Sequence, residues 1–139
     1  MNDIKNKVAY ITGGSKGIGL GIAKSLLDSG MRVAITSRSL GAAKEAAASL
    51  SNDSSKILAI ESEVSSLAAE MKAIKTVTDY FGQLDVVIAN AGIGHFAPID
   101  SITEEQWKET IDTNLTGVFN SVKASVESLK QSKGYIITI

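Results

Sequence analysis

A glycine-rich turn near the amino terminus is the segment of this sequence best suited to bind a ligand. Gly13, Gly17 and Gly19 follow the apolar run of residues 7–12 and open a segment with helical spacing. Glycine adopts backbone angles that other residues avoid, and it lets a backbone approach a bound group closely. The free N–H groups and the dipole of a helix start favour a phosphate. A purely structural turn is the alternative, but a glycine turn between a strand and a helix favours a bound dinucleotide.

The elements that would position this turn alternate between apolar runs and segments with helical spacing. The apolar runs predict strands at residues 7–12, 32–36, 56–61, 84–88 and 134–139. The helical spacing predicts helices from Gly17 to a stop at Gly30, over 40–50, over 65–81, and from a capping box at Thr103 and Gln106 through Leu129, with a break left open in the last. The strand runs are apolar throughout, which is typical of strands covered on both faces. We therefore expect an α/β fold, a parallel sheet between two layers of helices, in one domain spanning residues 1–139.

Composition and charge exclude several classes of protein. The 139 residues carry a net charge of −1, so no basic face for nucleic acid is expected. There is no cysteine, which excludes a disulfide framework, a thiolate metal site and a cysteine nucleophile. No apolar stretch approaches the ~20 residues that a membrane helix needs. We expect a cytoplasmic protein without a bound metal and without nucleic-acid or membrane partners.

The glycine turn has the spacing Thr-Gly-x-x-x-Gly-x-Gly, and two later motifs accompany it. Asn90-Ala91-Gly92 follows the fourth expected strand, and Asn114 lies within residues 112–117. In this order the motifs resemble those of the short-chain dehydrogenase/reductase family, in its common branch, over the whole chain. The resemblance implies a doubly wound Rossmann fold with strand order 3-2-1-4-5, and a dinucleotide at the turn. It assigns cofactor contacts in the turn to Thr12, Gly13, Ser15, Lys16, Gly17, Ile18 and Gly19.

The end of the second expected strand bears on which dinucleotide is bound. A carboxylate there would bind the adenosine ribose and repel a 2′-phosphate, which selects NAD. Ser37 and Arg38 occupy this place, and neither is acidic. Arg38 can form charge-assisted hydrogen bonds to a phosphate, Ser37 can add a hydroxyl, and Lys16 adds a second positive charge. Each cation alone would more often be a solvated surface charge, but together they favour NADP(H) over NAD(H).

Two more segments are expected to contact the adenosine part of the cofactor. The resemblance assigns Glu63 and Val64 to the adenine ring, although the family usually has an aspartate in place of this glutamate. An acid that favours a helix start is an equally good interpretation of Glu63. The resemblance also implies that the backbone of Asn90, Ala91 and Gly92 lines the adenosine ribose. A turn that simply ends a strand is the alternative there.

Catalysis in this family requires residues that the chain carries only in part. The resemblance implies a tyrosine that gives a proton to a substrate carbonyl, a lysine four residues later that lowers the tyrosine pKa, an orienting serine and a supporting asparagine. Asn114 matches the asparagine, and a bond to a backbone carbonyl is its alternative role. Tyr10, Tyr80 and Tyr135 are not followed by lysine four positions later. We therefore expect the 139 residues to supply the cofactor-binding part, with weakened or lost cofactor affinity and no turnover on their own.

These features favour an NADP(H)-dependent oxidoreductase that reduces a small-molecule carbonyl or oxidises the matching alcohol, resembling the 3-oxoacyl-(acyl-carrier-protein) reductases. A non-catalytic NADP(H)-binding module is the alternative. A sheet truncated after the fifth strand would expose Ile136 and Ile137 at its edge, so a homo-oligomer, a dimer or tetramer, is expected. Residues 93–96 could contact the cofactor or cover the substrate site, with His95 near its mouth. Trp107 is expected to pack against other residues.

Overall fold

A parallel sheet forms the centre of the molecule. The computed structural model describes residues 3–139, so residues 1–2 of the expected domain lie outside the described part. The strands are β1 (Val8–Ile11), β2 (Arg32–Ser37), β3 (Ile57–Glu61), β4 (Val86–Ala89) and β5 (Tyr135–Thr138). They pair in parallel in the order β3-β2-β1-β4-β5, which confirms the expected doubly wound α/β fold and its strand order.

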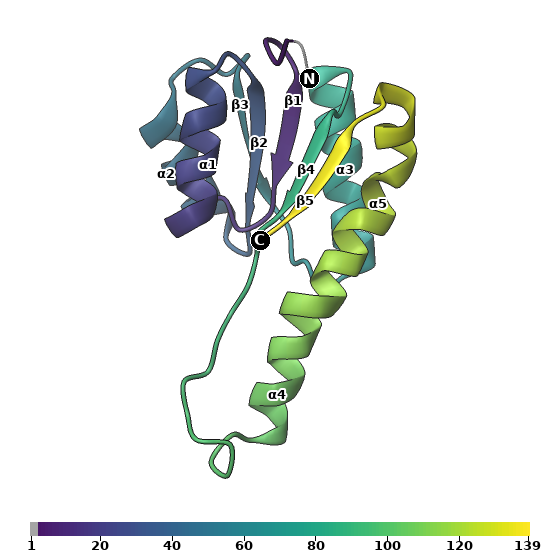
Figure 1. The fold of residues 1–139 in the computed structure, drawn as a ribbon. Coiled ribbons are helices and arrows are strands. Elements are labelled where there is room, and N and C mark those ends of the chain that lie inside the picture. The colour runs from purple at the N-terminus through teal and green to yellow at the C-terminus, as the bar shows by residue number, and fades with distance from the viewer. Residues whose placement is uncertain (1–2) are drawn as a thin grey trace.

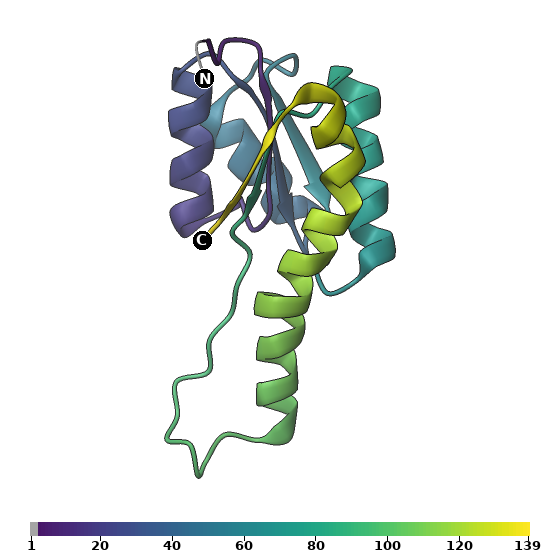
Figure 2. The same cartoon turned by 45° about the vertical axis from the view of Figure 1, so that its right-hand side comes forward.

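Helices cover both faces of this sheet. They are α1 (Gly17–Asp28), α2 (Leu40–Leu50), α3 (Leu67–Phe81), α4 (Glu104–Ile111) and α5 (Gly117–Ser132). Figure 1 shows α1 and α2 on one side of the sheet and α3 and α5 on the other, while α4 extends beyond the carboxyl ends of the strands. Figure 2, turned by 45°, shows the same two layers and the same projecting α4.

Two apolar cores result from this arrangement, because successive side chains of a strand point to opposite faces. Val8 and Tyr10 of β1 pack in a cluster with residues of α3 and α5. Ala9 and Ile11 pack in the other cluster, with residues of α1 and α2. All four side chains are fully buried, which explains why the strand reads as a continuous apolar run.

Polar side chains cap the first turns of three helices. Ser39 accepts a hydrogen bond from the Ala42 N–H at the start of α2, and Ser66 accepts one from the Ala69 N–H at the start of α3. At α4 the expected capping box between Thr103 and Gln106 is present in both directions, which confirms that prediction. The sequence predicted that α3 begins at residue 65. Because Ser66 is its N-cap, this helix begins at Leu67.

The break left open in the last helix is a turn of π-helix, η1 (Asp112–Thr116). It joins α4 to α5 without a loop, so the three segments form one column (Figures 1 and 2). A π-helical turn holds one residue more than an α-helical turn, and it often occurs at functional sites. Asn114 is at the centre of this turn.

Several large apolar side chains remain exposed outside the cores, and those of β5 and α4 bear on the sequence predictions. Ile136 and Ile137 of β5 are exposed, as expected from their position at a sheet edge. Trp107 is 59% exposed, so the expectation that it packs against other residues is wrong within the described part of the chain. The reason is that α4 projects away from the sheet, so the Trp107 indole does not reach either apolar core. No helix in residues 3–139 combines the length and apolar character needed to cross a membrane.

Candidate functional site

A cavity of about 420 Å³ lies at the carboxyl ends of β1, β2 and β4. These strands end together because Ile11 pairs with both Ile35 and Ile88. Segments far apart in the sequence line the cavity: Gly13, Ser15, Lys16, Gly17, Ile18, Thr36, Ser37, Arg38, Ala42, Ser62, Glu63, Val64, Asn90, Ala91, Gly92, Ile93 and Thr113. All of the cofactor-binding residues expected from the sequence therefore line this cavity, except Thr12 and Gly19.

Gly13 and Gly19 of the glycine turn cannot carry a side chain for steric reasons. Gly13 has a φ of +63°, and a Cβ placed there would lie 2.9 Å from the Cα of Ala91. A Cβ on Gly19 would lie 2.6 Å from Asn90 Nδ2 and 2.6 Å from Gly13 O. Such contacts are too close for carbon, so the first helix can pack against the turn only without these side chains. Gly19 acts behind the cavity and not on its surface.

Thr12 and Asn90 hold the turn to the end of β4. Thr12 Oγ1 accepts hydrogen bonds from the N–H groups of Asn90 and Ala91, each at 3.0 Å. Asn90 Nδ2 donates to Thr12 O at 3.0 Å and to Gly13 O at 3.2 Å. Thr12 is buried, so the structure places it as a support under the cavity wall.

The start of α1 differs from the capped helix starts because it opens into the cavity. Its N-cap residue is Lys16, whose side chain makes no capping hydrogen bond. The first N–H groups of a helix have no partner within the helix. Gly17 and Ile18, in the first turn of α1, line the cavity. An anion in the cavity would therefore meet unpaired N–H groups and the positive end of the helix dipole.

Two positively charged side chains also line this cavity. Lys16 and Arg38 are exposed, both line the cavity, and neither forms an ion pair with any residue in the range 3–139. Ser37 lies beside Arg38 at the end of β2. Its register partner is Glu61 of β3, whose Oε2 accepts a hydrogen bond from the Leu40 N–H at 3.3 Å. One carboxylate therefore lies near these positive side chains.

The segment after β3 forms another wall of the cavity. Glu63 does not begin a helix, because α3 starts at Leu67; its Oε1 accepts from the Ser65 N–H at 3.3 Å in the preceding turn. Val64 is buried and Glu63 is half-buried. Both line the cavity, as the sequence predicts.

Four lining residues were not expected from the sequence: Thr36, Ala42, Ser62 and Thr113; Ile93 belongs to the segment 93–96, for which the sequence left open a contact with the cofactor or a cover over the substrate site. Thr36 and Ser62 directly precede assigned residues at strand ends, so adjacency was an available signal. Ala42 and Thr113 carry no such signal, because helix packing brings them to the cavity.

Asn114 does not line the cavity, but it is bonded to a residue that does. Its Oδ1 accepts a hydrogen bond from the Ile93 N–H, and its Nδ2 donates to Ile93 O, both at 2.8 Å. The exposed Asn114 thus connects η1 to the loop after β4. In the same loop, His95 Nε2 lies 3.0 Å from Glu109 Oε2 of α4. These contacts hold the loop beside the α4–η1 column.

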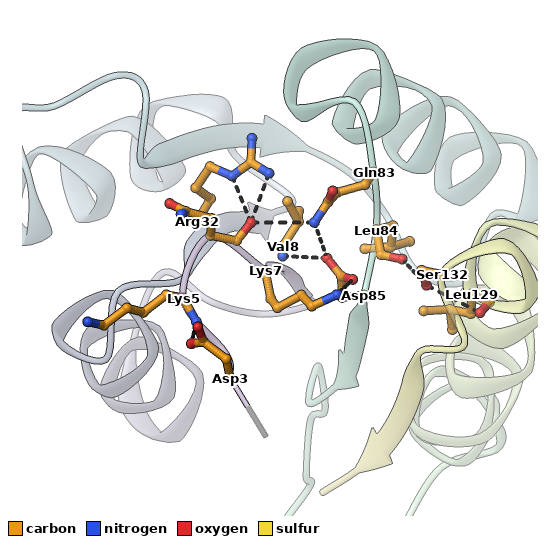
Figure 3. A network of polar contacts seen from close by, with 11 residues as sticks. Asp3, Lys5, Lys7, Val8, Arg32, Gln83, Leu84, Asp85, Leu129 and Ser132 are labelled. Atoms are coloured by element: carbon orange, nitrogen blue, oxygen red, sulfur yellow. Dashed lines mark hydrogen bonds and ion pairs between the residues drawn. The ribbon is translucent and has the colours of Figure 1, made fainter. Parts of the chain in front are cut away.

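A second cavity of about 420 Å³ lies at the opposite edge of the sheet, near the amino ends of β1 and β4. Figure 3 shows the polar network there, in which Asp85 is the central acceptor. Asp85 accepts from Lys7 Nζ at 3.0 Å, from the Val8 N–H at 2.8 Å and from Gln83 Nε2 at 2.7 Å. Because these groups satisfy one another, we assign no ligand to this cavity. Within residues 3–139 no group of three or more His, Asp or Glu side chains could hold a metal ion.

A glycine turn that meets an open helix start at the carboxyl edge of a doubly wound sheet defines a Rossmann-type nucleotide-binding domain. The chain belongs to the short chain dehydrogenase family, whose model matches residues 7–139.

Individual relatives agree with this assignment. The chain is 40% identical over 138 residues to a 3-oxoacyl-(acyl-carrier-protein) reductase of Staphylococcus aureus, covering 96% of this chain and 55% of the relative. It is 34% identical over 140 residues to an uncharacterised oxidoreductase of Methylorubrum extorquens, covering 100% of this chain and 56% of the relative. The chain thus spans a little over half the length of these relatives.

Solved structures share the fold. An alcohol dehydrogenase of Thermococcus sibiricus, complexed with 5-hydroxy-NADP, is 36% identical with a TM-score of 0.88, over 95% of this chain and 57% of that one. A 3-ketoacyl-(acyl-carrier-protein) reductase of Brucella melitensis, complexed with NADH, is 26% identical with a TM-score of 0.90, over 98% of this chain and 57% of that one.

Proposed function

We propose that the chain is the cofactor-binding part of an NADP(H)-dependent oxidoreductase of the short-chain dehydrogenase/reductase type. The observation that carries the proposal is the cavity in which the glycine turn and the uncapped start of α1 face the same space. The pyrophosphate would lie against the N–H groups of Gly17 and Ile18. The adenine would lie between the segment at Glu63 and Val64 and the segment at Ala91. The bound cofactor supplies or accepts a hydride.

NADP(H) is the preferred cofactor in this proposal. Lys16, Ser37 and Arg38 surround the place where the 2′-phosphate of the adenosine ribose would lie. The two unpaired cations would bind a phosphate dianion by charge-assisted hydrogen bonds, while Ser37 adds a hydroxyl donor. The Thermococcus enzyme complexed with 5-hydroxy-NADP supports this choice, whereas the Brucella enzyme was complexed with NADH.

The proposed reaction is reduction of a small-molecule carbonyl, or oxidation of the matching alcohol. Similarity to the Staphylococcus aureus reductase supports a 3-oxoacyl thioester as the substrate class. In this chain Asn114 positions the loop at Ile93, beside the cavity, and so supports the reacting end of the cofactor. The 139 residues contain no Tyr-x-x-x-Lys, and on their own they are proposed to give no turnover.

A homo-oligomer, a dimer or tetramer, is also part of the proposal. Leu115 and Phe119 are 65% and 57% exposed on η1 and α5, and Trp107 is exposed on α4. Exposed apolar side chains of this kind are typical of a subunit interface. Sedimentation equilibrium measures the assembly, and a strictly monomeric protein would contradict it. The cytoplasmic location and the absence of nucleic-acid and membrane partners stay predictions.

The experiment that tests the function is a calorimetric titration of the protein that contains this chain, with NADP⁺ and, separately, with NAD⁺. We expect NADP⁺ to bind at least about tenfold more tightly, a difference of about 1.4 kcal/mol. Equal affinity would refute the preference, and no binding of either would refute the cofactor site. NADPH oxidation with a 3-oxoacyl thioester then tests the chemistry in the protein that contains this chain. Binding without turnover in that protein would favour the non-catalytic alternative.

A further inference from the structure

A buried carboxylate lies behind the cavity, outside the set of residues that line it. Glu70 of α3 is 0% exposed. Its Oε1 accepts hydrogen bonds from Tyr10 Oη at 2.8 Å and from Ser62 Oγ at 2.6 Å, and its Oε2 accepts one from Ser121 Oγ at 2.8 Å. The donors come from β1, from the segment after β3 and from α5. One carboxylate therefore joins four parts of the fold.

Glu70 is stabilised by hydroxyl groups and not by a cation. No lysine, arginine or histidine within residues 3–139 forms an ion pair with it. Burying a carboxylate is unfavourable unless hydrogen bonds compensate the lost water, so each hydroxyl is held firmly in place. Burial, and then the nearby Glu70 carboxylate, raise the pKa of Tyr10, which keeps its hydroxyl a donor.

One of the three hydroxyls belongs to the cavity. Ser62 lines it and is followed by Glu63 and Val64; we call residues 62–64 the adenine wall. The adenine wall lies beyond the paired part of β3. This strand is at the edge of the sheet, and its last register pair with β2 is Ser37 with Glu61. The wall retains one backbone bond to β2, from the Ser62 N–H to Ser37 O at 3.0 Å.

The remaining support of the wall comes from helices behind it. Ser62 Oγ is bound by Glu70 of α3, and Val64 O accepts from Asn120 Nδ2 of α5 at 2.8 Å. Gly117, at the start of α5, lies so close that a Cβ there would be 2.7 Å from Val64 Cγ2. The position of the wall thus depends on contacts from α3 and α5.

We propose that Glu70 is a positioning residue for adenine binding: its carboxylate fixes Ser62 through the bond to Ser62 Oγ, and so sets the adenine wall at the distance that the adenine ring requires. The proposal rests on the proposed function, because it presumes a nucleotide in the cavity. Glu70 then affects the affinity for the adenine group, and not only the free energy of unfolding. The bond that matters is the one between Glu70 and Ser62.

Two matched variants separate that bond from the rest of the cluster. Ser62→Ala removes the link to the wall, whereas Tyr10→Phe removes an equally buried hydroxyl from the same carboxylate oxygen and leaves the link intact. The two quantities to be measured are the hydrogen exchange of the amides of residues 62–65 and the affinity for AMP, which contains adenine without nicotinamide. For Ser62→Ala we expect about tenfold faster exchange and about tenfold weaker AMP binding. For Tyr10→Phe we expect lower stability to urea, with wall exchange and AMP affinity within about twofold of the unmodified chain.

A second pair acts on the carboxylate itself. Glu70→Gln keeps an oxygen acceptor for Ser62, and its amide can donate to Ser121 Oγ, whose proton is then free to bond to Gly117 O, 2.9 Å away. We expect this variant to retain AMP affinity and slow wall exchange. Glu70→Leu removes the acceptor, and we expect it to behave as Ser62→Ala does. If Glu70→Leu does not fold, Ser62→Ala and Glu70→Gln still decide the question.

The outcomes distinguish this proposal from the proposed function. Equal effects of Ser62→Ala and Tyr10→Phe on the wall amides, or no effect of Ser62→Ala, would overturn the positioning role. Wall amides that respond as expected in a chain that binds no AMP would support the mechanical link and overturn both the nucleotide site and the adenine role. An AMP affinity that changes without any change at the wall would also overturn the proposal.

Discussion

The side chain of Asn114 and the backbone of Ile93 exchange two hydrogen bonds of 2.8 Å, so that the asparagine pairs with the loop as a neighbouring strand would. The π-helical turn η1 places Asn114 beside the loop, where a Cβ on Gly92 would lie in ordinary van der Waals contact with Asn114 Oδ1, at 3.4 Å. Asn114 therefore acts through Ile93, which lines the cavity, and not by lining it directly.

Replacing Asn114 should release this loop. In Asn114→Ala both hydrogen bonds are lost, and we expect the free energy of unfolding to fall by about 1 kcal/mol because net hydrogen-bond contributions are modest at exposed positions. Amides of residues 92–96 should exchange faster with solvent, measured by mass spectrometry. Asn52→Ala, an exposed asparagine in a bend far from this loop, is the control. Unchanged exchange in Asn114→Ala would contradict the link.

Arg38 should determine the preference for the 2′-phosphate. In Arg38→Gln we expect NADP⁺ affinity to fall about tenfold or more, since charge-assisted bonds contribute about 1.5–3 kcal/mol, while NAD⁺ affinity stays within about twofold. Titration calorimetry with both cofactors measures the ratio. Lys44→Gln removes the same charge from an exposed position of α2 outside the cavity and should leave the ratio unchanged. A parallel fall for both cofactors in Arg38→Gln would count against a phosphate contact.

Glu61 should weaken NADP⁺ binding in the natural sequence. Its carboxylate accepts from Leu40 N and is paired in register with Ser37, so its negative charge lies near the expected 2′-phosphate. Glu61→Gln keeps an acceptor and removes the charge, and we expect NADP⁺ to bind about threefold more tightly at low salt, with less gain as salt screens the charge. Glu45→Gln, on the exposed face of α2, is the matched control. NADP⁺ affinity that does not rise in Glu61→Gln would show that the carboxylate is too remote.

Two glycines of α1 should respond in opposite directions to alanine. A Cβ on Gly19 would meet Asn90 Nδ2 and Gly13 O, so Gly19→Ala should cost about 1–3 kcal/mol of stability and displace the helix start from the turn. A Cβ on Gly21 meets nothing within 4 Å, so Gly21→Ala should stabilise the helix by about 0.5–1 kcal/mol. Urea unfolding of both variants measures these changes. Similar effects of the two substitutions would argue against the packing described for Gly19.

Tyr10 should make stability depend on alkaline pH. Burial, and then Glu70, raise its pKa well above the ordinary value of 10.0. Because the folded state holds this proton more tightly, the associated stability is fully present below pH 10 and is lost as the pH rises towards the folded pKa. Above pH 10 the unmodified chain should lose up to about 1.4 kcal/mol per pH unit more than Tyr10→Phe does. Urea unfolding between pH 8 and pH 11, roughly the range around the ordinary pKa of tyrosine, measures the difference, and parallel curves would contradict it.

Features that depend on neighbours in the chain could be predicted from the sequence. The bounds of α2 agree with residues 40–50, because Ser39 caps the helix and the alanine spacing is local. The capping box at Thr103 is likewise made by residues within one turn. The position of the glycine turn follows from residues close together in the chain, whereas the strand order was implied only by the family resemblance that the turn and the later motifs carry. Trp107 was mispredicted because its environment depends on α4 projecting from the sheet.

By itself the sequence determined the elements, the sheet class and most of the residues that meet at the cavity, because strand ends and helix starts carry local signals. Glu70 was not predicted as a site residue from the sequence, although it shares a helical face with Ala73, Ile74 and Val77. Only the tertiary structure decided that three hydroxyls from separate elements surround its carboxylate, and that Asn114 pairs with Ile93. Such contacts join residues far apart in the chain, and no spacing along the sequence specifies their distances.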